Sequence, residues 1–149
     1  MKKAEEIKKE AQQNFENSYN CAESILRAYL KVYDKDISLL SAATCFGGGV
    51  AGTGRMCGAL SGALIALGLH FNRQKPKEKE LYGKIRDKAQ KIVKEFEKKT
   101  GSVNCSDHVK YDLTTVEGRE KLHNDKEALE KCKSFIGLAS RLLADELQE

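Results

Sequence analysis

The chain has 149 residues, of which 32% are charged and one is proline, and its formal net charge at pH 7 is +4. This length can bury one hydrophobic core, so we expect residues 1–149 to form a single domain. Lysines alternate with glutamates in segments such as KKAEEIKKE, which is typical of i, i+4 ion pairs on exposed helix faces. The modest charge and its mixed pattern argue against a nucleic-acid partner.

The amino terminus, MKKAEEIKKEA, is basic but lacks the apolar segment of a signal peptide. The central apolar run is shorter than the roughly 20 residues that a membrane-spanning helix requires. We therefore predict a cytoplasmic protein with no membrane insertion. Because permanent disulfides are uncommon in that compartment, five cysteines indicate redox or metal chemistry rather than a secreted disulfide framework.

Apolar residues recur at helical spacing along most of the chain, and no segment shows the alternation of a strand. The expected fold is all-α, with five or six helices. The first helix spans about 3–16, and the second spans about 21–33 behind a capping box formed by Asn20 and Glu23. A short third helix follows over about 37–45.

The stretch 45–69, CFGGGVAGTGRMCGALSGALIALGL, is the least charged part of the chain, and the other elements are organised around it. It predicts a central helix over about 55–70 that is packed on most sides. Small residues recur every fourth position along one face, where another helix or a ligand could approach the backbone closely. These residues are Gly54, Gly58, Gly62 and Ala66. A face of this kind also favours a homodimer.

The second half of the chain predicts one long helix and two further helices. The long helix runs from Pro76 to about Lys99. Residues 102–113 predict a turn or a short helix that carries Cys105, and a capping box at Thr114 starts the next helix. The last two expected helices cover about 115–123 and 126–147.

The glycine-rich loop between Gly47 and Gly54 has two interpretations. Free backbone amides ahead of a helix could bind a phosphate or a carboxylate. The loop is not a Walker loop or a dinucleotide fingerprint, because no Gly-Lys-Ser/Thr follows and no strand precedes it. The favoured interpretation is a tight connection in which glycine permits positive φ angles.

The cysteines carry the candidate chemistry. We expect Cys57 in the first turn of the central helix, where amides and the helix dipole would lower its pKa and make it reactive or metal-ligating. It could equally be a small buried hydrophobe. Cys21 and Cys132 lie on apolar helical stripes, a pattern typical of core residues, and Cys105 begins a C-x-x-H pair with His108. If the helices bundle, these four cysteines could converge.

The absence of a C-x-x-C motif excludes the thioredoxin motif and the common spacings of zinc ribbons and ferredoxins. A site assembled from separate elements is still compatible with the sequence. Cys45 ends a predicted helix beside the glycine loop, and its role is open.

The order of these residues resembles the C_GCAxxG_C_C family of putative redox-active proteins. Its CGAxxG motif stands here as Cys57-Gly58-Ala59-Leu60-Ser61-Gly62, after a cysteine in Asn20-Cys21-Ala22-Glu23 and before one each in GSVNCSDHVKYDLTTVEGRE and EKCKSFIGLASRLL. The resemblance covers roughly residues 10–145. It implies that the four characteristic cysteines are Cys21, Cys57, Cys105 and Cys132, and it leaves Cys45 without a counterpart.

Three functions follow from the residues and this resemblance. The first is thiol and disulfide chemistry centred on Cys57, as a thiol oxidoreductase or an electron-transfer protein with an unidentified redox partner and no cofactor. Cys21 paired with Cys57, and Cys105 paired with Cys132, are the favoured disulfides. The second is a metalloprotein in which the same four cysteines bind zinc or an iron–sulfur cluster. The third is a non-catalytic helical interaction module.

Overall fold

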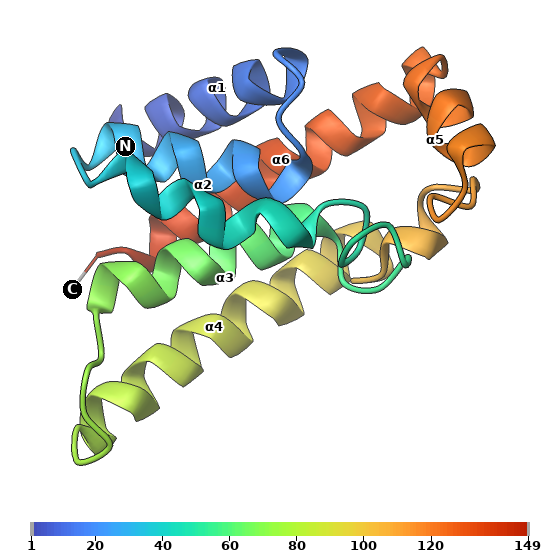
Figure 1. Cartoon of the computed structure of the whole chain (residues 1–149). Helices are drawn as coiled ribbons and strands as arrows, with labels where there is room; N and C mark the ends of the chain where they lie inside the picture. The colour runs from blue at the N-terminus through green and yellow to red at the C-terminus, as the bar shows by residue number, and fades with distance from the viewer. Residues whose placement is uncertain (1, 149) are drawn as a thin grey trace.

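The computed structural model describes residues 2–148, and over this range the chain forms six α-helices and two 3₁₀ segments (Figure 1). The predicted all-α class is confirmed, and the described residues contain no strand beyond one isolated bridge. The elements are α1 (Lys2–Glu16), α2 (Cys21–Val32), η1 (Ile37–Phe46), α3 (Gly58–Phe71), α4 (Lys79–Thr100), η2 (Cys105–Asp107), α5 (Val116–His123) and α6 (Lys126–Glu146). No helix among the described residues is long and apolar enough to cross a membrane.

Helix α3 lies at the centre of the arrangement and packs against α2, α4, α6 and η1. Figure 1 shows it between α2 on one side and α4 on the other. Its sequence, GALSGALIALGLHF, has no charged residue, and a helix that is apolar all round is stable only when it is buried. The predicted central position of this helix is therefore confirmed.

The close contact between α3 and α2 depends on two glycines. A Cβ atom added at Gly62 would lie 2.6 Å from the carbonyl oxygen of Ala22, and one at Gly58 would lie 2.9 Å from the Cβ of Cys21. Both distances are shorter than van der Waals contact, so α2 can approach this closely only because both side chains are absent. The small-residue face is therefore covered by α2 of the same chain, and it is not free to form the homodimer that the sequence favours.

Several helix ends have the caps that the sequence predicts. The Asn20 side chain accepts from the Glu23 amide, and the Glu23 carboxylate accepts from the Asn20 amide, which completes the capping box. Asp36 caps the third helix through the Ser38 amide, although this element is a 3₁₀ helix. Gly101 ends α4 with a φ of 90°.

The central helix begins at Gly58, so the predicted start near residue 55 is wrong. The backbone has positive φ angles at each residue from Gly48 to Gly52 and again at Gly54, which a right-handed helix cannot contain. The Cys57 amide donates to the Val103 carbonyl at 2.7 Å, outside the helix. Cys57 is consequently the N-cap of α3 and does not lie in its first turn.

The structure also differs from the sequence prediction at the start of α4 and at the cap of α5. Helix α4 starts at Lys79 instead of Pro76, because the Glu78 carboxylate accepts from the Lys75 amide and holds the preceding residues in a turn. Helix α5 is capped by Thr115, whose hydroxyl accepts from the Gly118 amide, while Thr114 donates to the Asp112 carboxylate instead.

We expect Gly62→Ala to lower the free energy of unfolding by about 1–3 kcal/mol, because its methyl group must displace the backbone of α2. The matched control is Gly68→Ala in the same helix, where nothing lies within 4 Å of the added methyl group. That change should raise the free energy of unfolding by about 0.5–1 kcal/mol. Urea denaturation measures both, and equal effects of the two substitutions would contradict the packing described here.

Candidate functional site

Two distant segments lie side by side at one end of α3 and bring Cys57 next to Cys105. Met56 and Asn104 form an isolated antiparallel bridge. The Cys57 amide donates to the carbonyl of residue 103, and the Cys105 amide donates to the Arg55 carbonyl, both at 2.7 Å. Each cysteine follows its bridge residue directly in the sequence, so the bridge holds the two side chains in neighbouring positions.

The glycine-rich loop packs directly against Cys105. A Cβ atom at Gly49, where φ is +70°, would lie 2.7 Å from the Cβ of Cys105 and 2.6 Å from the Arg55 backbone. The amides of residues 50–55 all donate to backbone carbonyls of residues 45–50. These six amides are therefore not available for an anion, and the loop acts as the tight connection that the sequence favours.

Cys21 and Cys132 approach the site from two helices. Cys21 is the first residue of α2, where the capping box fixes the start of the helix. The side chains of Cys21 and Cys132 are hydrogen-bonded to each other. Cys132 lies on α6, which packs against α1, α2 and α3. The contact between α2 and α6 therefore brings together two cysteines that are far apart in the sequence.

The four cysteines form one cluster, which we define as Cys21, Cys57, Cys105 and Cys132. Each of the six pairs in this cluster lies close enough for charge on one sulfur to raise the pKa of another, or for the two thiols to share a hydrogen bond. All of them are free thiols. Cys45 is exposed and belongs to η1, outside the cluster.

The cluster is not arranged as a metal site. No group of three or more His, Cys, Asp and Glu residues between positions 2 and 148 could hold a metal ion. His108 does not complete the C-x-x-H pair: its Nε2 is 2.8 Å from the Ser102 carbonyl oxygen, and its ring packs on Phe135. The side chain of His108 is half-buried and has a structural role there.

Cys132 is the member of the cluster that most readily loses its proton. The S–H group of Cys21 donates to the Cys132 sulfur, and the ammonium group of Lys131 lies nearby, so the pKa of Cys132 falls below its usual value even though burial opposes this. The same hydrogen bond, together with burial, raises the pKa of Cys21 well above its usual value. The pair therefore loses its first proton more readily than an isolated thiol does, and it holds its second proton more tightly.

The other two cysteines retain their protons at neutral pH. Burial raises the pKa of Cys105 to about 12, with a further contribution from the neighbouring sulfurs. Burial also raises the pKa of Cys57, so the predicted lowering is wrong. The amides of Ala59 and Leu60 oppose this rise only in part, and no cap hydrogen bond forms at the Cys57 side chain. Arg55 is not among the groups that shift the pKa of Cys57, and its guanidinium donates to the Thr53 carbonyl.

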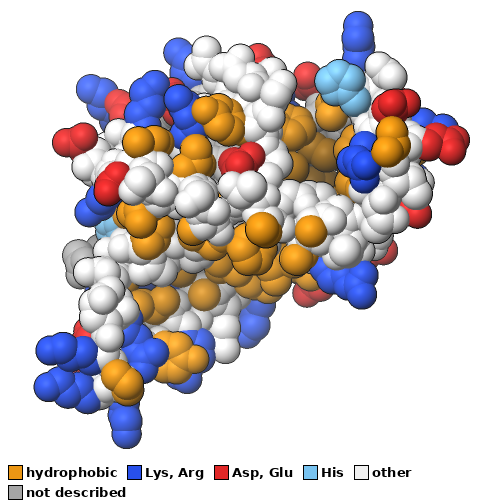
Figure 2. Space-filling view, viewed as in Figure 1, with side chains coloured by type: hydrophobic (Ala, Val, Ile, Leu, Met, Phe, Trp, Pro, Cys, Tyr) orange, Lys and Arg blue, Asp and Glu red, His pale blue; other side chains and the backbone are white. Residues whose placement is uncertain are grey.

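A hollow of about 410 Å³ opens onto the cluster, and Cys21, Cys105 and Cys132 are part of its wall. Figure 2 shows a recess with an apolar floor between the body of the molecule and the lobe that carries α5. The rest of the wall is mostly apolar, with a few polar groups from α5, η1 and the glycine loop. The remaining lining residues are Phe15, Asn20, Thr44, Gly47, Gly48, Val109, Leu113, Arg119, Leu122, His123 and Leu129.

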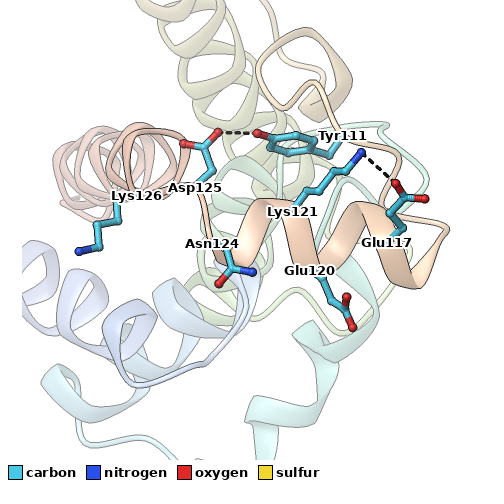
Figure 3. A pocket seen from close by; sticks show the side chains of 7 residues that line it. All are labelled: Tyr111, Glu117, Glu120, Lys121, Asn124, Asp125 and Lys126. Carbon is cyan, nitrogen blue, oxygen red and sulfur yellow. Dashed lines mark hydrogen bonds and ion pairs between the residues drawn. The ribbon is translucent and has the colours of Figure 1, made fainter.

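A larger hollow, of about 740 Å³, lies at the junction of α5 and α6 and contains no cysteine (Figure 3). Four of its polar side chains bind one another: the Tyr111 hydroxyl donates to Asp125 at 2.7 Å, and Lys121 pairs with Glu117 at 2.9 Å. The Lys121–Glu117 pair is exposed and contributes little to stability. The hollow at the cluster is therefore the better candidate for a functional site.

Sequence reasoning missed several residues of this site. Lys131 is adjacent to Cys132 in the sequence, and a lysine beside a cysteine is a signal that could have been used. Arg119 and His123 lie one helical turn apart on α5, and both line the hollow. No local pattern points to them, because only the tertiary structure carries α5 to the cysteines.

A family profile described as "Putative redox-active protein (C_GCAxxG_C_C)" matches residues 19–146. The chain belongs to this family. The C_GCAxxG_C_C protein is also 30% identical over 132 residues to an "Uncharacterized protein" of Archaeoglobus fulgidus, in an alignment that covers 81% of this chain and 86% of that one. No solved structure matches the chain.

The motif expected from the sequence as CGAxxG is GCAxxG in the family description, so this C_GCAxxG_C_C protein has Cys57 and Gly58 in the reverse order. The order matters here, because position 58 faces Cys21 and has no room for a Cβ atom.

We expect Cys132 to be alkylated fastest at pH 7 among the four cluster cysteines, because it has the largest thiolate fraction. Cys21→Ala should raise the pKa of Cys132 and slow its alkylation at that pH, whereas Cys21→Ser should retain much of the rate through its hydroxyl donor. Iodoacetamide labelling between pH 6 and pH 10 (about the range in which thiols titrate), followed by peptide mass spectrometry, gives both profiles. A Cys132 profile that is the same in the wild type and in Cys21→Ala would contradict the assignment.

Proposed function

We propose that this protein is a cytoplasmic thiol redox protein whose reacting pair is Cys132 and Cys21. The observation that carries the proposal is the hydrogen bond between their side chains, with the lowered pKa of Cys132, at the wall of an open hollow. A reactive dithiol needs one thiolate to attack, a second thiol within bonding reach, and access for the substrate. The lowered pKa of Cys132, its hydrogen bond to Cys21 and the hollow beside them support these three requirements in turn.

The reaction is a thiol–disulfide exchange with a disulfide substrate as the oxidant. The Cys132 thiolate attacks one sulfur of the substrate, which forms a mixed disulfide and releases the other sulfur as a thiolate. Cys21 then gives its proton to the departing thiolate, and its sulfur attacks Cys132. The Cys21–Cys132 disulfide forms, the second half of the substrate leaves as a thiolate, and two electrons pass from the protein to the substrate.

This assignment changes the role of Cys57. Its raised pKa makes it a poor attacking group, and its place beside Cys105 supports these two cysteines as a second dithiol next to the first. The pairings expected from the sequence, Cys21 with Cys57 and Cys105 with Cys132, become the competing outcomes of the test.

We expect mild oxidation in a disulfide redox buffer to form a Cys21–Cys132 bond first. Blocking free thiols with an alkylating agent, then digesting the protein and mapping the disulfide-linked peptides, identifies the pair. Cys132→Ser should abolish this bond, and Cys45→Ser should leave it unchanged, because Cys45 lies outside the cluster. Complete alkylation of all four cysteines across the cytosolic range of redox potential would overturn the proposal.

A second function is supported by the convergence of four sulfurs from separate elements. All four sulfurs lie close enough to affect one another's pKa, and four cysteines are a ligand set that zinc and iron–sulfur clusters use, although the cluster as described is not arranged as a metal site. The thiols would then be ligands, and the protein would carry electrons or handle metal.

Native mass spectrometry of protein purified without oxygen separates the two functions. The thiol redox proposal predicts a metal-free chain that loses about two mass units for each disulfide formed. The metalloprotein function predicts the added mass of zinc or of an iron–sulfur cluster. Serine at any one of the four cluster positions should then release the metal. Retention of the metal in all four variants would exclude the cluster as its site.

A further inference from the structure

We infer that the hollow beside Cys21 and Cys132 binds a small disulfide that has an apolar carbon chain and a terminal carboxylate, the class to which lipoate belongs. This inference rests on the proposed function, because it names the substrate of the same cysteine pair. It is drawn from the size, the lining and the charge of the hollow.

The size of the hollow suits a small molecule. Pockets of about 300–1,000 Å³ hold most small ligands, and this one measures about 410 Å³. Its wall joins the start of α2, the segment that follows η2, helix α5 and the first turns of α6. A ligand in it lies against Cys21 and Cys132, which are part of the wall.

The lining of the hollow favours an apolar chain. Most of its wall consists of hydrophobic side chains. The free energy falls when such side chains contact an apolar chain instead of water. A polar disulfide such as glutathione disulfide would lose hydrogen bonds to water against this surface without replacing them. The hydrophobic members of the wall, apart from the cysteines, are Phe15, Val109, Leu113, Leu122 and Leu129.

The charge of the hollow favours a carboxylate. Among the described residues that line it, none is acidic, and Arg119 carries a permanent positive charge. One guanidinium N–H of Arg119 donates to the Leu113 carbonyl at 3.0 Å, which fixes the side chain at the wall. Arginine has five N–H donors, so others remain to bind a carboxylate. His123, one turn further along α5, offers a ring N–H in either tautomer.

The balanced reaction with lipoate follows from the proposed exchange. The Cys132 thiolate opens the cyclic disulfide and forms a mixed disulfide, and the released sulfur of the substrate takes the proton from Cys21. Cys21 then attacks Cys132, which releases the second sulfur as a thiolate that takes a proton from water. The products are dihydrolipoate and the Cys21–Cys132 disulfide, and dihydrolipoate drives the same steps in reverse.

Octanoate, which has the chain and the carboxylate but no sulfur, tests the pocket separately from the thiol chemistry. Isothermal titration in a Cys45→Ser background should show saturable binding at one site. Octanamide, which lacks the charge, should bind at least about tenfold more weakly, because a charge-assisted hydrogen bond is lost.

Three variants of α5 test the role of Arg119. Arg119→Gln should weaken octanoate binding about tenfold, and Arg119→Lys should restore most of it because the charge returns. The matched control Lys121→Gln removes a positive charge from the same helix. Because Lys121 lines the other hollow, octanoate binding should not change. If Arg119→Gln does not fold, His123→Gln provides the second test and should weaken binding as well.

The last measurement compares the oxidation of the reduced protein by lipoate, lipoamide and glutathione disulfide. Lipoate should react fastest, and Arg119→Gln should lower its rate to that of lipoamide. Exchange at equal rates with all three disulfides, together with no octanoate binding, would overturn this inference and leave the proposed function intact. Octanoate binding without any exchange would overturn the proposed function, and with it the substrate assigned here.

Discussion

The close contact of α3 with the start of α2 is the constraint on which the candidate site depends. It is possible only because Gly58 and Gly62 lack side chains where the backbone of α2 passes. The same contact places Cys21 against the first residue of α3 and next to its N-cap, Cys57. A larger residue at either glycine would separate the two helices and, with them, two of the four sulfurs. Stability and chemistry are thus set by one packing contact.

The cluster brings together four groups that cannot all ionise. Burial disfavours every thiolate, and each sulfur that ionises makes the next proton harder to remove. The first charge settles on Cys132, where the Cys21 hydrogen bond and Lys131 favour it. One thiolate among protonated neighbours is the arrangement that exchange chemistry uses, since the attacking and resolving roles are then held by different residues. Four equivalent thiolates would instead require a bound cation.

The difference between Cys57 and Cys132 illustrates where sequence reasoning about cysteine reactivity fails. A cysteine at a helix start after a glycine loop suggests a lowered pKa, and the amides of Ala59 and Leu60 do act in that direction. Burial outweighs them, because Cys57 is only 8% exposed. Cys132 lies in the second turn of α6 on an apolar stripe that is typical of core residues, yet its hydrogen bond to a distant cysteine lowers its pKa. Position along the helix therefore predicts the wrong cysteine as the one with the lowered pKa, because the pKa depends on hydrogen-bond partners and solvent exposure.

The sequence by itself determined the helical class, most helix boundaries, the capping box at Asn20 and the central place of α3, since these depend on local periodicity, capping residues and the absence of charge. It also identified the four cysteines as a set. Only the tertiary structure decided which of them share a hydrogen bond, in which direction their pKa values shift and that Arg119 of α5 lines the same hollow. Those properties depend on contacts between residues as far apart as Cys21 and Cys132, and no local pattern encodes the distance between such residues.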